Sequence, residues 1–160
     1  MLGLESRALT KEPPRPPAVL VGSLLRQAHQ ALWRRVLEHI RKAGFEDIGL
    51  SLLAVFQHPS PEGQSPIEVA RRLGISKQAL NYLLRQLEER GYLERRQGVD
   101  ANRGRRVRLT PRGRALSAEA RAAVLAVERD WAQRLGPEQY RVFREALTEL
   151  AQGLEQSKES

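Results

Sequence analysis

The apolar residues of this chain recur at helical spacing over most of its length. From residue 18 to residue 43 they return every three or four positions, and Gly44 follows as a helix-ending residue. The apolar stripe of this first helix comprises Leu25, Ala28, Leu32, Val36 and Ile40. A shorter apolar segment at 50–56 predicts a second helix, and the Pro- and Gly-rich stretch at 58–64 predicts a loop.

Two helix-start signals follow in close succession. Ser65-Pro66-Ile67-Glu68 has the pattern of a capping box with proline at the first helical position, which predicts a helix that ends at Gly74. Ser76 is the N-cap of the next predicted helix, 77–90, which stops at Gly91. Only Gly74-Ile75-Ser76 separates the two helices, so the sequence predicts a helix-turn-helix.

The remaining elements complete the expected order. Residues 92–97 and 105–109 are predicted as short strands, the second from its period-two alternation, and pair as a hairpin around a polar tip. Two long helices follow, at 110–135 and from Gly136-Pro137 to about 154. A hairpin directly after a helix-turn-helix makes a winged helix, so the fold class is mainly α (α+β).

The positive charge is concentrated in the predicted winged helix. The chain has a net charge of +8, and residues 65–114 alone carry 13 Lys and Arg against 5 Asp and Glu. The rest of the chain carries equal numbers of basic and acidic residues, so all of the excess lies in this stretch. A focused basic patch suits a polyanion such as DNA, because neutralised phosphates release counterions. The alternative is a solvated basic face with no partner.

One face of the second helix of this pair carries groups that read bases. The opposite face is apolar and comprises Leu80, Leu83, Leu84 and Leu87. Gln and Asn bond adenine through two atoms, and Arg bonds guanine in the same way. The candidate base-reading residues are Lys77, Gln78, Asn81, Tyr82 and Arg85. The alternative is an ordinary solvent-exposed polar face.

The residues around this helix supply candidate contacts to the DNA backbone. The hairpin is rich in arginine, and Arg103 lies near its tip, where it would enter a minor groove or contact phosphate alone. The candidate phosphate and wing residues are Ser65, Arg71, Arg72, Ser76, Arg95, Arg96, Arg103, Arg105, Arg106 and Arg108.

The segment from Ser65 to Gly113 resembles the MarR family of bacterial transcription regulators. The resemblance rests on Glu68–Gly74 (EVARRLG), Ser76–Asn81 (SKQALN), Leu87–Arg95 (LEERGYLER), Arg103 and Val107–Gly113 (VRLTPRG). It implies an obligate homodimer with two winged lobes on a palindromic operator. It also implies control by a small ligand, commonly an aromatic or phenolic anion, bound between the dimer lobe and the winged lobe.

The sequence supports dimerisation independently. Apolar residues near the end of the chain step by 3, 4, 3 and 4, which is typical of a coiled-coil seam. This seam comprises Tyr140, Phe143, Leu147, Leu150 and Leu154. The alternative is packing against the first helix of the same chain. We therefore expect a disordered arm at 1–17, N-terminal helices at 18–58, a winged helix-turn-helix at 65–114 and C-terminal dimerisation helices at 115–155.

Two aromatic residues of the first helix are candidates for the effector pocket. His29 and Trp33 lie on or beside its apolar stripe, as does His39. The alternative is that the histidines are buried and bonded to backbone or across the dimer.

No enzyme or cofactor motif is found. The chain has no cysteine, no phosphate-binding Gly-rich loop and no nucleophile elbow, and the spacing between His29 and His39 suits no standard metal site. Without a signal pattern or an apolar run of about 20 residues, a cytoplasmic location is expected. Two functions remain: a dimeric, ligand-responsive repressor of transcription, and a winged-helix module that binds another protein.

Overall fold

The computed structural model describes residues 19–57, 61–96 and 106–156. The arm predicted at 1–17, the hairpin tip, His58, Arg103 and Arg105 lie outside these residues. The described elements are α1 (Val21–Lys42), α2 (Leu50–Leu53), the 3-10 helix η1 (Ala54–Phe56), α3 (Pro66–Leu73), α4 (Lys77–Glu89), β1 (Leu93–Arg96), β2 (Arg106–Leu109), α5 (Pro111–Leu135) and α6 (Pro137–Gln156). This order confirms the predicted fold class.

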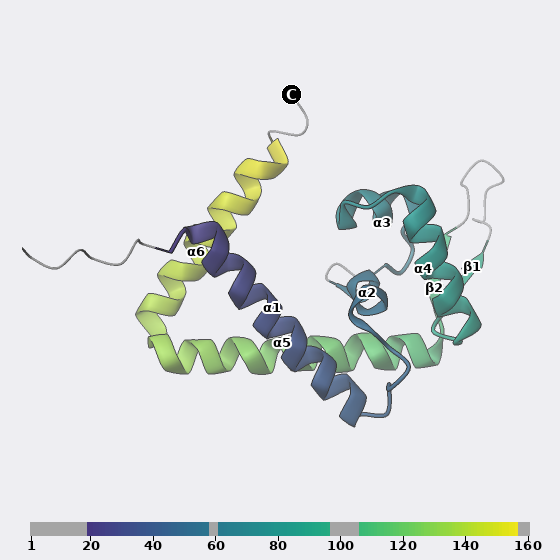
Figure 1. Cartoon of the computed structure of the whole chain (residues 1–160), viewed down its shortest axis with the longest axis horizontal. Coiled ribbons are helices and arrows are strands. Elements are labelled where there is room, and N and C mark those ends of the chain that lie inside the picture. Colours follow the sequence, from purple (N-terminus) through teal and green to yellow (C-terminus); the bar gives the residue numbers. More distant parts are fainter. Residues whose placement is uncertain (1–18, 58–60, 97–105, 157–160) are drawn as a thin grey trace, which may run out of the picture.

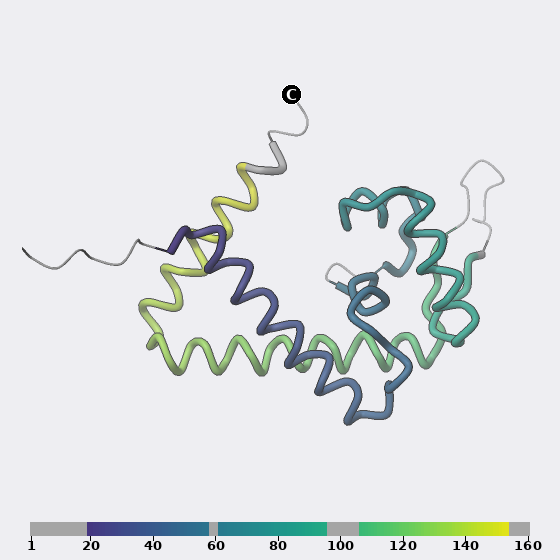
Figure 2. The backbone as a smooth tube through the Cα atoms, in the orientation of Figure 1, coloured from purple at the N-terminus to yellow at the C-terminus, as the bar shows by residue number. Residues whose placement is uncertain are grey.

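The other elements of the fold are arranged along the long helix α5. Helix α1 crosses it and packs against it, while α2, α3, α4 and the hairpin gather over its N-terminal half (Figure 1). After Gly136 the chain reverses into α6, which rises from the far end of α5 (Figure 2). An ion pair and a hydrogen-bonding contact join α1 to α5: Arg35 Nη1 lies 2.7 Å from Asp130 Oδ2, and His39 Nε2 lies 2.8 Å from Glu119 Oε2.

In the wing, β2 forms backbone hydrogen bonds on both of its sides, whereas the sequence predicts a pairing with β1 alone. β1 and β2 are antiparallel, with Leu93 opposite Leu109. On the other side of β2, the amide of Gly63 donates to the Val107 carbonyl at 2.8 Å, and the Val107 amide donates to the Gln64 carbonyl at 2.9 Å. The predicted loop therefore ends with two backbone hydrogen bonds to β2, which fix the wing to the start of α3.

The core lies under the helix-turn-helix. Apolar side chains from every described element except α6 meet there, and Tyr92 is the largest of those that are fully buried. The predicted apolar face of α4 is confirmed, because Leu80, Leu84 and Leu87 have no exposed area and Leu83 is partly buried. This packing leaves the opposite face of α4 outward.

The stripe of α1 divides into two parts. Val36 and Ile40 are buried, as predicted, whereas Leu25 and Ala28 are exposed in the single chain. The start of α1 and the residues just before it carry a row of exposed apolar side chains, namely Val19, Leu20, Val21, Leu24 and Leu25. Each helix in the described part of the chain is too short or too polar to cross a membrane.

Candidate nucleic-acid interface

The two helix starts are fixed as the sequence predicts. The Ser65 hydroxyl accepts from the Glu68 amide at 3.3 Å while the Ser65 amide donates to Glu68 Oε2, so the capping box is confirmed. These two bonds, with Arg106 and Arg71 adding to them, hold the pKa of Glu68 below its usual range. The Ser76 hydroxyl accepts from the Ala79 amide at 3.1 Å, and Gly74 takes a left-handed conformation (φ 66°). Both candidate serines therefore act as caps of their helices.

The outer face of α4 carries the candidate base-reading residues. Lys77, Gln78, Tyr82 and Arg85 are exposed, with Tyr82 at 60%, whereas Asn81 is half-buried. A hollow beside this face joins α4 to the first turn of α3 and to β1. It is lined by Ser65, Pro66, Ile67, Lys77, Asn81, Arg85 and Arg95. Three separate elements of the chain thus bring their polar groups to one concave surface.

Arg95 joins the wing to α4. Its Nε and Nη2 donate to Glu88 Oε2 at 2.9 and 2.5 Å, its own amide donates to Glu88 Oε1 at 3.1 Å, and its Nη1 lies 3.5 Å from Asn81 Oδ1. We expected a phosphate contact from sequence. The structure gives Arg95 the carboxylate partner Glu88, so Arg95 holds α4 against β1, and its contact with phosphate stays a prediction.

The other arginines of the wing differ in their surroundings. Arg106 Nη1 donates to the Gly63 carbonyl at 3.2 Å and to Glu68 Oε2 at 3.1 Å, which ties β2 to the start of α3. Arg108 is exposed on the outer side of the same strand. Arg96 belongs to β1, but its side chain lies outside the described residues.

Arg71 and Arg72 are neighbours with different environments. Arg71 is exposed on the surface of α3. Arg72 turns inward: its Nη1 donates to the Gln57 carbonyl at 2.5 Å and its Nη2 to the Val55 carbonyl at 3.2 Å. Burial lowers the pKa of its guanidinium. Two donors of Arg72 are thus bonded to backbone carbonyls of the protein, and the phosphate contacts expected of Arg71 and Arg72 stay predictions.

One polar network was missed by the sequence reasoning. The Tyr92 hydroxyl donates to Asp47 Oδ1 at 2.6 Å, and Arg112 Nη2 lies 3.1 Å from the same oxygen. The Arg112 guanidinium also stacks 4.4 Å from the centre of the Tyr92 ring and donates to the Arg90 carbonyl at 2.9 Å. No local signal reveals these contacts, because Asp47 precedes the helix-turn-helix and Arg112 follows the wing.

A second hollow lies between α1 and α2 with η1. Both candidate effector residues line it, and Trp33 Nε1 donates to His29 Nε2 at 2.9 Å. Its full lining is Gln27, Ala28, His29, Gln30, Ala31, Trp33, Arg34, Leu50, Ser51, Ala54 and Gln57. His29 and His39 are both exposed in the single chain, and their burial across a dimer stays a prediction. No cluster of His, Asp or Glu within the described ranges could hold a metal ion.

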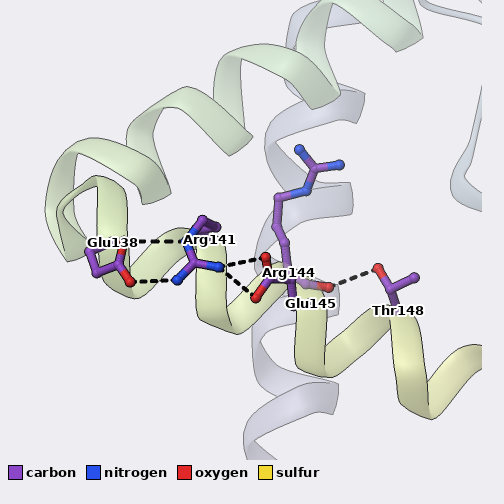
Figure 3. A network of polar contacts seen from close by, with 5 residues as sticks. All are labelled: Glu138, Arg141, Arg144, Glu145 and Thr148. Atoms are coloured by element: carbon purple, nitrogen blue, oxygen red, sulfur yellow. Dashed lines mark hydrogen bonds and ion pairs between the residues drawn. The ribbon is translucent and has the colours of Figure 1, made fainter.

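The predicted seam of α6 faces two ways. Tyr140, Phe143 and Leu147 are half-buried and line a hollow with Trp131 near the end of α5, whereas Leu150 is 59% exposed. The side chain of Leu154 lies outside the described residues. A different side of α6 is polar: Arg141 bridges Glu138 and Glu145, and the Thr148 hydroxyl donates to the Arg144 carbonyl (Figure 3).

Comparisons with known proteins agree with this architecture. The sequence profile of the MarR family matches residues 52–106. The crystal structure of the Mycobacterium tuberculosis MarR family protein Rv2887 with salicylic acid has a TM-score of 0.62 and 31% identity, covering 84% of this chain and 98% of the other. The chain belongs to the MarR family. The MarR family protein Rv2887 has also been solved with DNA, at a TM-score of 0.60 and 28% identity, covering 83% of this chain and 98% of the other.

Curated relatives match this chain over a shorter stretch. The HTH-type transcriptional repressors Rv2887 of M. tuberculosis and Mb2911 of Mycobacterium bovis are each 39% identical over 88 residues, which is 55% of this chain. The matched stretch spans 63% of the length of each of these repressors.

Proposed function

We propose that this chain is a homodimeric, sequence-specific double-stranded-DNA-binding regulator of transcription, a repressor of the MarR type that a small aromatic or phenolic anion releases. The observation that carries the proposal is the hollow where Lys77, Asn81 and Arg85 of α4 meet the capped start of α3. A bacterial regulator of this kind works beside the chromosome, so we place it in the cytoplasm.

The outer face of α4 is proposed to enter the major groove. Gln78, Tyr82 and Arg85 project from it, and its chemistry matches the donors and acceptors of base edges. The exposed Arg71 and Arg108 are proposed to contact phosphates. Outside the described side chains, Arg96, Arg103 and Arg105 remain candidates for the same role.

Dimerisation is supported by apolar surface at both ends of the chain. Leu20 just before α1 is 78% exposed and has exposed apolar neighbours in Val21 and Leu24, and Leu150 on α6 is 59% exposed. A second copy would cover both regions. A two-fold dimer presents two α4 helices about one DNA turn apart, so the operator is proposed to be an inverted repeat with half-sites about 10 base pairs apart.

The hollow between α1 and η1 is the proposed effector site. Its lining combines the apolar Leu50 and Ala54 with the aromatic Trp33 and the basic Arg34, a composition that suits a small aromatic anion. The related protein Rv2887 has been solved with salicylic acid and with p-aminosalicylic acid, which supports this ligand class.

The alternative is a winged helix that binds another protein. The concentration of positive charge in residues 65–114 weighs against it, because the cores of protein interfaces are depleted of charge. Selection of bound sequences from a random double-stranded DNA pool separates the two. We expect an enriched inverted repeat whose binding weakens when salicylate is added, whereas a pool without enrichment would leave the interaction module as the better interpretation.

A further inference from the structure

Arg72 of α3 is bonded to Gln57, one of the residues that line the hollow between α1 and η1. It lies in the last turn of α3, immediately before the Gly74-Ile75-Ser76 turn that leads into α4. Its guanidinium reaches back to the carbonyl oxygens of Gln57 and Val55, at 2.5 and 3.2 Å. A residue of the DNA-binding unit is therefore bonded directly to the segment at the end of η1.

The carbonyls that Arg72 holds belong to a helix end. The last carbonyl groups of a helix have no donor within the helix and carry partial negative charge, so a cationic donor stabilises them. Gln57 also lines the hollow between α1 and η1, together with Ala54 one turn earlier. Val55 and Phe56 are buried between these residues, so η1 has little room to move without α3.

We propose that Arg72 is the positioning residue that transmits occupancy of the α1–η1 hollow to the DNA-binding helices. This inference rests on the proposed function. A molecule seated against Ala54 and Gln57 displaces the end of η1. The two hydrogen bonds carry that displacement to the last turn of α3, and α4 changes its angle to the groove. Packed elements respond in this way by discrete shifts, and a small movement at a ligand is enough.

The test compares Arg72→Met with the matched control Arg71→Met. Methionine keeps an unbranched apolar stem in the half-buried site but donates no hydrogen bond. DNA affinity for the enriched inverted repeat is measured with and without saturating salicylate, and salicylate affinity is measured on the free protein by calorimetry. We expect salicylate to weaken DNA binding by about tenfold in the wild type and by less than about threefold in Arg72→Met. Salicylate should still bind Arg72→Met with unchanged affinity.

The control distinguishes coupling from direct DNA contact. Arg71→Met should weaken DNA binding equally with and without salicylate. The ratio of its DNA affinity without salicylate to that with salicylate should therefore equal the wild-type ratio. Circular dichroism verifies that each variant is folded. If Arg72→Met does not fold, Arg72→Lys replaces it, because lysine keeps the charge but lacks the planar fork that places two nitrogens against two separate carbonyls. A wild-type ratio in the Arg72 variant would overturn the inference and leave the proposed function standing.

A second experiment tests the same coupling without a ligand. Ala54→Phe fills the hollow from its own wall and should weaken DNA binding in the wild-type background but not in Arg72→Met. If salicylate has no effect while Ala54→Phe acts through Arg72, the effector class is wrong and the role of Arg72 is supported. If neither salicylate nor Ala54→Phe changes DNA affinity in the wild type, both the role of Arg72 and the proposed ligand response fail.

Discussion

At the residue scale, Gly113 has the tightest surroundings of the described glycines. It lies in the first turn of α5, where the Thr110 hydroxyl accepts from its amide at 3.1 Å. A Cβ added to Gly113 would lie 1.9 Å from the Tyr92 carbonyl oxygen, which is a backbone atom that also accepts from the Thr110 amide at 3.1 Å. Only glycine therefore allows α5 to start this close to the end of the helix-turn-helix.

Gly113→Ala should destabilise the protein although the residue is helical. Glycine to alanine normally stabilises a helix by up to about 1 kcal/mol. Here the methyl group must displace backbone, and we expect the free energy of unfolding to fall by about 2–4 kcal/mol in urea titration. The control is Gly153→Ala in α6, where the added Cβ meets open space. Equal stability changes at the two sites would contradict this account of Gly113.

Tyr92 gives a prediction for alkaline pH. Its side chain is buried, and burial, followed by its hydrogen bond to Asp47, raises its pKa to about 12 from an ordinary value of 10. Since the folded state holds the proton more tightly, this contribution to stability is complete below pH 10. It is lost as pH rises through 12.

Tyr92→Phe should remove this pH dependence. At pH 8 the variant should lose about 1–2 kcal/mol in the free energy of unfolding, because the hydrogen bond to Asp47 disappears. Between pH 10 and 12 the wild type should lose stability faster than the variant, so the difference should shrink. The other tyrosines are common to both proteins and cancel in the comparison. If the free energies of unfolding of the wild type and of Tyr92→Phe fell in parallel from pH 10 to pH 12, the raised pKa of Tyr92 would be contradicted.

At the element scale, the proposed base contacts of α4 and the proposed phosphate contact of α3 predict different dependence on DNA sequence. Arg85→Ala should cost about 1–3 kcal/mol in binding to the enriched operator and much less on random DNA, since a base contact exists only where the right base is present. Arg71→Ala on α3 should weaken binding to both DNAs alike, because phosphate carries no sequence information. Polarisation titrations at one fixed salt concentration measure the affinities of the wild type and of both variants for the two DNAs. If Arg85→Ala lost the same binding free energy on both DNAs, Arg85 would contact the DNA backbone and not a base.

The elements themselves were predictable because their signals are local. Each helix start depends on a cap one position before it, Ser65 for α3 and Ser76 for α4. The buried face of α4 depends on the spacing of apolar residues within the helix itself. The pairing of Gly63 and Gln64 with β2 was not predictable, since it depends on backbone bonds between segments that the whole helix-turn-helix separates in sequence. For the same reason the sequence did not distinguish Arg71 from Arg72. They are identical neighbours, and only the docking of η1 beside α3 turns one of them inward.

At the scale of the whole molecule, α5 links the DNA-binding unit to the proposed dimer lobe. Its first turn contacts Tyr92 at the edge of the winged helix, and its last turns meet α6 (Figure 1). Sequence reasoning placed the α4 face and the His29–Trp33 pair near their observed surroundings, because helical periodicity determines which side chains share a face. It did not foresee the exposed first half of α1, since burial there depends on the proposed second chain.

Leu147 tests the proposed dimer at this scale. It is half-buried beside Trp131, and the seam residues Tyr140 and Phe143 lie on the same side of α6. Leu147→Asp would place a carboxylate between two chains, and an unpaired buried charge costs several kcal/mol. We expect sedimentation to show loss of the dimer, with folding followed by circular dichroism. The matched control is Val142→Asp, because Val142 is 52% exposed and lies on the side of α6 away from the seam. That variant should remain dimeric, whereas an intact dimer for Leu147→Asp would show that the two chains associate through another surface.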